Sequence, residues 1–159
     1  MEYPPKYSEW VPIGRLVKGL VLATTVWILV GIALVVAFLP LDLEALIGVG
    51  VSLVILIFIL LLFVNFRGIR IQIASDKLIV SYGVLNIKSI RLDDVKFCRV
   101  VKASFGRYGG IGIRYGLDGS YAYTTSFGNA VEVTPREDRT FVFSSSNPHE
   151  ICDIIIHNG

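Results

Sequence analysis

Two long runs without a charged side chain constrain this chain more than any other feature of its sequence. The runs extend from Gly19 to Leu41 and from Ala45 to Phe66. Each exceeds the roughly 20 residues that an α-helix needs to cross the hydrocarbon core of a bilayer. The sequence therefore predicts two membrane-spanning helices, residues 19–41 and 45–66, which form one transmembrane hairpin over residues 19–66.

A cleaved secretory signal is the main alternative for the first run. A signal peptide has an apolar core of about 7 to 15 residues and then a small-x-small cleavage site. The first run is longer, and Ala37-Phe38-Leu39-Pro40 offers no such site. We therefore favour a spanning helix, and a pair of helices buried in a soluble protein is disfavoured further.

The charges that flank the runs predict the orientation. The juxtamembrane basic residues are Arg15 and Lys18 before the first run and Arg67 and Arg70 after the second, whereas residues 40–44 between the runs carry only acidic charges. Basic flanks are retained on the cytoplasmic side. We expect a two-pass protein of the cell membrane with both termini in the cytoplasm. Cys98 and Cys152 would then lie in a reducing compartment, as buried small residues rather than as a disulfide.

The connection between the runs is short, so the two helices should lie antiparallel as neighbours. Ala33 and Ala37, and likewise Gly48 and Ser52, are four residues apart, the small-xxx-small spacing that lets helix backbones approach closely. We expect helix–helix contact at these four residues. Trp27, near the middle of its run, predicts either a surface for another membrane protein or packing against the second helix.

Residues 1–18 are predicted to be an N-terminal cytoplasmic segment. Tyr3, Tyr7 and Trp10 lie beside Pro4 and Pro5. Aromatic residues favour the membrane–water interface. These three aromatic residues therefore suggest an interfacial anchor ahead of the first helix.

After Phe66 the hydrophobic period changes to two, which is typical of strands. Short apolar runs separated by turn residues follow at 69–73, 78–82, 87–92, 96–102, 111–115, 121–125, 130–134 and 140–143. Then Asn147, Pro148 and Glu150 form a helix start, followed by an apolar stripe of Ile151, Ile154 and Ile155. Residues 67–159 are thus predicted to form a cytoplasmic β-domain, a barrel or sandwich, with a C-terminal helix.

Several motifs in this region carry a family resemblance. They are Asp76–Val80 with Gly83, Ile87–Val95, Gly112–Tyr115, and Phe141–Ser145 leading into Asn147–Glu150. On these motifs, residues 67 to 157 resemble the bacterial and archaeal pleckstrin-homology-like domains, many of which follow a two-helix membrane anchor. The resemblance implies a small β-barrel of seven or eight strands capped by a C-terminal helix. It also implies a binding or scaffold module rather than an enzyme.

The residues agree with a module that has no catalytic chemistry. The runs contain no ionisable residue of the kind that marks an ion path. The sequence shows no Ser-His-Asp set, metal-ligand spacing or cofactor fingerprint, and the glycines of Gly109–Gly112 lead into another strand. The formal net charge of +2 is too small to indicate nucleic acid. We expect no cofactor, no metal and no nucleic-acid partner.

Four arginines form the candidate surface for an anion or an acidic partner: Arg91, Arg99, Arg107 and Arg114. The alternative is that they are solvated charges on outer strand faces. In eukaryotic relatives of the family that bind phosphoinositides, basic residues cluster in the first hairpin. Here that hairpin carries one lysine at its turn, Lys77, beside Asp76, so the resemblance does not imply specific inositol-lipid binding.

These features predict a membrane-anchored cytoplasmic binding or scaffold module. Its expected partners are the lipid bilayer, including an anionic leaflet surface, and another membrane or cytoplasmic protein or a second copy of the chain. The alternative is an accessory integral subunit of a larger membrane protein complex.

Overall fold

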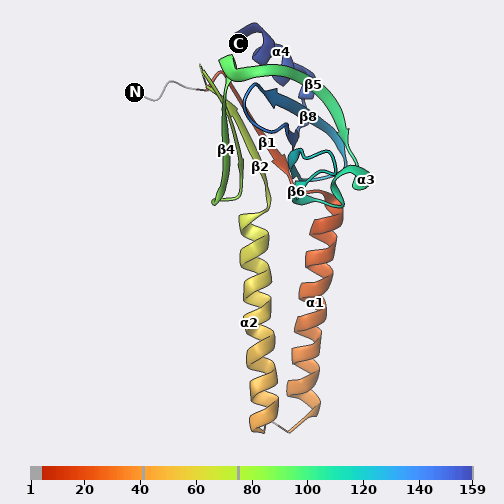
Figure 1. Ribbon diagram of the computed structural model, residues 1–159. Helices are drawn as coiled ribbons and strands as arrows, with labels where there is room; N and C mark the ends of the chain where they lie inside the picture. The colour runs from red at the N-terminus through yellow and green to blue at the C-terminus, as the bar shows by residue number, and fades with distance from the viewer. Residues whose placement is uncertain (1–4, 41, 75, 159) are drawn as a thin grey trace. The chain divides into compact units, whose positions relative to one another are not determined.

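The computed structural model describes residues 5–40, 42–74 and 76–158 (Figure 1). The chain divides into two compact units. The helical unit is Gly14–Asn65, and the β-rich unit combines the residues up to Ile13 with those from Phe66 onward.

The helical unit contains the two predicted helices. They are α1, Arg15–Phe38, and α2, Leu43–Asn65. Pro40 lies in the connection, and Asp42 Oδ1 accepts a hydrogen bond from the Ala45 N–H at 2.9 Å, which caps the start of α2. Both helices are long and apolar enough to cross a membrane. Two long apolar helices are thus confirmed where the sequence predicts them, with ends that differ by a few residues.

The apolar side chains of these helices point outward. No residue of α1 is buried, and in α2 Leu56 is the one buried residue among those the structure describes. A helix in the core of a soluble protein would bury a continuous apolar stripe. The exposure of both helices is instead what a lipid-facing hairpin requires.

The helices face each other along residues that recur every three or four positions. These half-buried or buried residues are Val21, Thr25, Ile28, Ile32 and Val35 in α1, and Ala45, Val49, Ser52, Leu56 and Ile59 in α2. This spacing is typical of left-handed packing of helices at a small crossing angle.

The predicted small-residue contact differs from this seam. Of the four predicted residues, Ser52 lies in the seam, whereas Ala33, Ala37 and Gly48 are exposed. A Cβ atom added to Gly48 would meet nothing within 4 Å. Trp27 is 81% exposed, so it does not pack against the second helix. The helices pack through branched apolar side chains, and no close backbone approach is needed at Gly48.

The β-rich unit begins before the hairpin. Strand β1, Tyr7–Pro12, pairs antiparallel with β2, Gly68–Ile73, and the Ile13 N–H donates to the Arg67 carbonyl at 2.8 Å. The hairpin is therefore inserted between two neighbouring strands of one sheet. The prediction of a separate segment over residues 1–18 was wrong at this point, because β1 has its partner far downstream. Tyr7 and Trp10 lie in β1, and Tyr3 falls outside the described residues.

Two sheets make up the body of this unit. The first has the order β1-β2-β3-β4, with β3 at Lys77–Tyr82 and β4 at Asn86–Arg91. The second has the order β5-β8-β9-β7-β6, with Val95–Ala103 (β5), Gly112–Tyr115 (β6), Tyr121–Thr124 (β7), Gly128–Pro135 (β8) and Phe141–Ser144 (β9). Every pair is antiparallel except β7–β9. Among the described strands no hydrogen-bonded ladder joins the two sheets, so they do not close a barrel.

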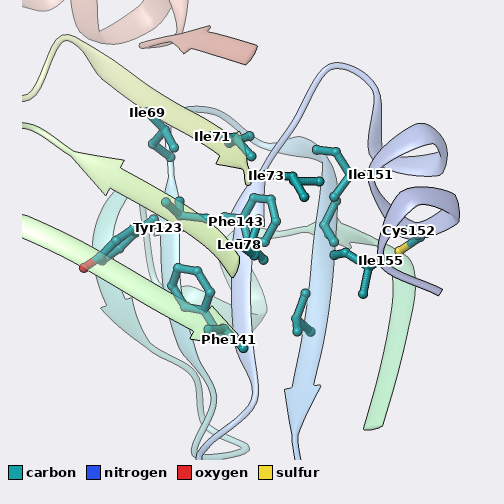
Figure 2. Close-up of a cluster of buried hydrophobic side chains, with 14 of the residues drawn as sticks. Ile69, Ile71, Ile73, Leu78, Tyr123, Phe141, Phe143, Ile151, Cys152 and Ile155 are labelled. Carbon is teal, nitrogen blue, oxygen red and sulfur yellow. The ribbon is translucent and has the colours of Figure 1, made fainter. Parts of the chain in front are cut away.

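The core lies between the sheets and is closed by α4, Pro148–Asn158 (Figure 2). Ile69, Ile71 and Ile73 of β2 are fully buried, as are Phe141 and Phe143 of β9. From α4, Ile151 and Ile155 point into the same core. Burial of each such side chain contributes about 1.5–3 kcal/mol. The predicted helix and its apolar stripe are confirmed.

Cys98 and Cys152 form a disulfide with a Cα–Cα distance of 5.4 Å. The expectation of two unpaired thiols was therefore wrong. Cys98 faces the core from β5, and Cys152 lies beside the apolar stripe of α4. The two residues meet because α4 packs against β5. The disulfide fixes the helix to the second sheet.

Candidate functional site

A buried carboxylate lies on the outer face of the second sheet. In β8, Val131 and Val133 point into the core, so Glu132 points to the opposite face. Side chains on such a face are usually solvated, yet Glu132 is 2% exposed. A buried carboxylate needs partners, because its desolvation would otherwise cost several kcal/mol.

Two of the four predicted arginines are these partners. Arg99 stands opposite Glu132 in the β5–β8 register, and its guanidinium donates to Oε1. Arg107 belongs to the short helix α3, Phe105–Tyr108, and its Nη2 donates to Oε2 at 2.7 Å. Both carboxylate oxygens of Glu132 are thus occupied.

Arg107 also joins α3 to the turn between β6 and β7. Its Nη2 and Nε donate to Asp118 Oδ2 at 2.6 and 2.9 Å. Asp118 Oδ1 in turn accepts from the Ser120 hydroxyl at 2.6 Å, and that hydroxyl lies 3.3 Å from the Tyr108 hydroxyl. We call these six residues, Arg99, Arg107, Tyr108, Asp118, Ser120 and Glu132, the arginine–carboxylate network.

The network is electrically balanced. The Ser120 hydrogen bonds, followed by Arg107, lower the pKa of Asp118 from 3.8 to about 2. Burial lowers the pKa of Arg107, but the hydrogen bonds to Glu132 and Asp118 outweigh burial and raise it. Two guanidinium groups therefore face two carboxylates. The network holds α3 over the small residues Ala122, Ala130 and Val142, and it has no surplus charge for an incoming anion.

The structure does not gather the four predicted arginines on one surface. Arg91 ends β4 in the first sheet and pairs with Asp93, and both side chains are exposed. Arg114 is exposed on β6, with its guanidinium beside Gly110, and forms no ion pair with any residue that the structure describes. Of the predicted surface, Arg114 alone remains an unpaired cation within the described chain.

The juxtamembrane basic residues are exposed. Arg67 lies over the Trp10 ring at 5.7 Å from its centre, and Arg70 stands opposite Trp10 in the β1–β2 register. Arg15 and Lys18 lie in the first turns of α1. Within the described residues none of these four forms an ion pair.

A small cleft that the sequence did not predict lies at the edge of the β-rich unit. Its volume is about 210 Å³, and it is lined by Lys88, Tyr115, Tyr121, Asp138, Arg139 and Phe141. Lys88 and Asp138 form an ion pair at 2.5 Å, and this hydrogen bond lowers the pKa of Asp138. The two residues are far apart in sequence, so no local pattern could have indicated the pair.

The described residues contain no group of three or more His, Cys, Asp or Glu side chains placed to hold a metal ion. The chain matches no protein-family model, no curated protein and no solved structure. The fold and the surfaces of the chain are therefore the basis for inferring its function.

Proposed function

We propose that the chain is a two-span membrane protein whose β-rich unit is a pleckstrin-homology-like binding module held at the membrane surface. The observation that carries the proposal is the insertion of the apolar hairpin between β1 and β2. Ile13 and Arg67 share a hydrogen bond, so the chain leaves and re-enters the β-rich unit at one place. A hairpin with outward apolar side chains needs lipid around it, and its two ends are fixed to one folded body.

The strand order supports the pleckstrin-homology-like assignment. Without the β6–β7 hairpin, the unit is a four-stranded meander, a three-stranded meander β5-β8-β9 and a C-terminal helix. Seven strands followed by a C-terminal helix are what the sequence resemblance implies, although the two sheets do not close the expected barrel. The β6–β7 hairpin is then an addition between β5 and β8, attached to the far edge of β9.

The module acts by binding rather than by catalysis in this proposal. Glu132, the most buried ionic group of the described residues, is used to hold α3 in place. The other charged residues described above are mostly exposed, and exposed surfaces suit contact with a protein partner or with the leaflet itself.

We place the β-rich unit in the cytoplasm, because the basic residues flank the hairpin on that unit's side. The disulfide favours an oxidising compartment instead. A thiol at position 137, introduced as Glu137→Cys on an exposed loop, separates the two orientations. In intact cells, a membrane-impermeant maleimide should leave this thiol unmodified, and modification without lysis would place the unit outside.

Excision of the hairpin tests the central proposal. Residues Gly14–Asn65 are replaced by a short loop containing Asn-Gly, a sequence that favours tight reversal between paired strands. The full chain should sediment with membranes and require detergent, whereas the excised chain should be folded and remain in the supernatant. A full chain that stays folded in the supernatant without detergent would overturn the proposal.

A second candidate is an accessory subunit of a larger membrane complex. Trp27 is 81% exposed near the middle of α1, and a groove of about 480 Å³ beside it is lined in part by Gly31 and Gly48. An exposed tryptophan beside small residues suits a helix of another protein. Stoichiometric co-purification in mild detergent would favour this candidate over a freestanding module.

A further inference from the structure

We propose that one end of the β-rich unit rests in the membrane interface, with five exposed apolar side chains in the lipid headgroup region. They are Trp10, Val84, Leu85, Phe105 and Phe127, which we call the apolar rim. The inference rests on the proposed function, since it requires the hairpin to span a bilayer. It holds for either orientation of the protein.

The first part of the rim belongs to the first sheet. Val84 and Leu85 form the turn between β3 and β4 and are 78% and 84% exposed. Tyr82, just before this turn, pairs with Ile69, which follows Gly68 at the start of β2. The turn therefore lies at the end of the strands where the chain arrives from α2. Trp10 lies at the same end, with its ring over Gly68.

The second part of the rim belongs to the second sheet. Phe105 and Phe127 are exposed, and their ring centres are 6.1 Å apart. They lie close in sequence to Ala103 and Gly128, which stand opposite each other in the β5–β8 register where β5 ends and β8 begins. Within the β-rich unit, α3 lies at the same end as the last residues of β1 and the β3–β4 turn (Figure 1).

The chain itself keeps this end close to the bilayer. Helix α1 starts two residues after Ile13, and β2 starts three residues after the end of α2. At about 3.5 Å per residue, these connections span on the order of 10 Å or less. The headgroup region of one leaflet has a comparable thickness.

The two ends of the β-rich unit differ in chemistry. The opposite end carries Asp76 in the β2–β3 turn and the charged residues 136–139 between β8 and β9. Hydrogen bonds from Leu92 to Asp76 and from Arg136 to Asp94 bring these connections together. The rim end instead shows aromatic and aliphatic tips beside the exposed cations Arg67 and Lys102. Exposed apolar side chains next to basic residues are typical of surfaces that contact the membrane interface.

The test uses the full-length protein in phosphatidylcholine vesicles, with and without phosphatidylserine. An environment-sensitive fluorophore is attached at Leu85→Cys or Phe105→Cys, one position from each sheet. The control positions are Glu137→Cys at the charged end and Val54→Cys on the exposed face of α2. The protein without an added cysteine reports any labelling of the native pair. Lipids that carry a nitroxide near the headgroup, or deeper in the acyl chain, serve as quenchers.

We expect the rim labels to emit at shorter wavelength and to be quenched by the shallow nitroxide, and the label at position 137 to show neither change. Phosphatidylserine should strengthen the quenching because of Arg67 and Lys102. Rim labels that are as weakly quenched as the label at position 137, while the label at position 54 is quenched by the deep nitroxide, would overturn the inference and leave the proposed function intact. An unquenched label at position 54 would instead refute the hairpin in the bilayer.

Two further outcomes would also overturn the inference. Equal quenching at the rim and at position 137 would mean that no particular end meets the lipid. A shift of the rim labels to shorter emission wavelength that disappears as the protein-to-lipid ratio is lowered would assign the rim to contact with a second copy of the chain. If either rim variant fails to fold, Val84→Cys in the β3–β4 turn and Phe127→Cys in the β7–β8 connection repeat the test.

Discussion

Two neighbouring threonines at the end of β7 differ in their hydrogen bonding although both are buried. Thr124 Oγ1 accepts from the Gly112 N–H at 3.2 Å and lies 3.2 Å from the Gly112 carbonyl, whereas Thr125 Oγ1 has no partner among the described residues. A buried polar group without a partner costs about 1–3 kcal/mol. The two hydroxyls should therefore have opposite effects on stability.

We expect Thr125→Val to raise the free energy of unfolding by about 1 kcal/mol or more, because it removes an unpartnered hydroxyl at nearly constant volume. Thr124→Val should lower it by about 1–3 kcal/mol, because the Gly112 N–H loses its acceptor. Chemical unfolding of the full chain in mild detergent, followed by near-ultraviolet circular dichroism, measures both. Changes of the same sign in the two variants would contradict this account.

Asp118 should make stability depend on pH in the acid range. Its pKa falls from 3.8 to about 2 on folding, through Ser120 first and then Arg107. A lowered folded pKa gives stability that is complete above the unfolded pKa and is lost as pH falls toward the folded one. The unfolding midpoint should drop between about pH 4 and pH 2, and drop less in Asp118→Asn. Equal acid sensitivity in both proteins would show that Asp118 contributes nothing.

Glu132 shows why the candidate site could be predicted only in part. The alternation in β8 correctly places its side chain on the face opposite Val131 and Val133. The same alternation predicts a solvated carboxylate, whereas α3 covers Glu132 from a separate loop. The two-residue alternation of a strand does not show whether a distant segment covers one of its faces. The arginines were therefore identified as charges, but their neutralisation was not.

At the scale of elements, strands β2 to β9 follow the predicted runs closely, because each run is short, rich in apolar residues and bounded by turn residues. Strand β1 was missed for a different reason. Tyr7–Pro12 follows two prolines and ends in a third, and its partner strand lies beyond the whole hairpin. The sequence around β1 contains no signal for a neighbour so far along the chain.

The pairing of β1 with β2 depends on a glycine at the junction with α2. A Cβ at Gly68 would lie 2.6 Å from the Trp10 ring and 2.7 Å from the Val11 carbonyl oxygen. The carbonyl is backbone and cannot rotate away, so Gly68→Ala should lower the free energy of unfolding by about 1–3 kcal/mol.

Gly106→Ala in α3 is the matched control for this substitution. A Cβ at Gly106 meets nothing within 4 Å, so stability should change little. Thermal unfolding of both variants in the same detergent gives the comparison. A Gly68→Ala variant as stable as the Gly106→Ala variant would show that the strands shift freely at the junction.

At the scale of the whole molecule, the disulfide joins segments 54 residues apart and fixes α4 over the core. Replacing both Cys98 and Cys152 by alanine should lower the free energy of unfolding by about 2–5 kcal/mol, largely because the unfolded chain gains conformational entropy without the crosslink. The measurement is chemical unfolding with and without a reductant. Reductant should destabilise the parent protein and leave the double variant unchanged, and an equal response of the two proteins would argue against a bond.

The position of the hairpin between β1 and β2 also sets an order of events during synthesis. The ribosome delivers β1 first, but its partner emerges only after both apolar helices have been made. Until then β1 is an unpaired edge with nothing to dock against. Once the helices lie side by side, their ends bring the two strands together, which removes most of the entropy cost of closing so long a loop. If the hairpin inserts as we propose, completion of the β-rich body is coupled to that insertion, and we expect a chain that fails to insert to fail also in assembling its first sheet.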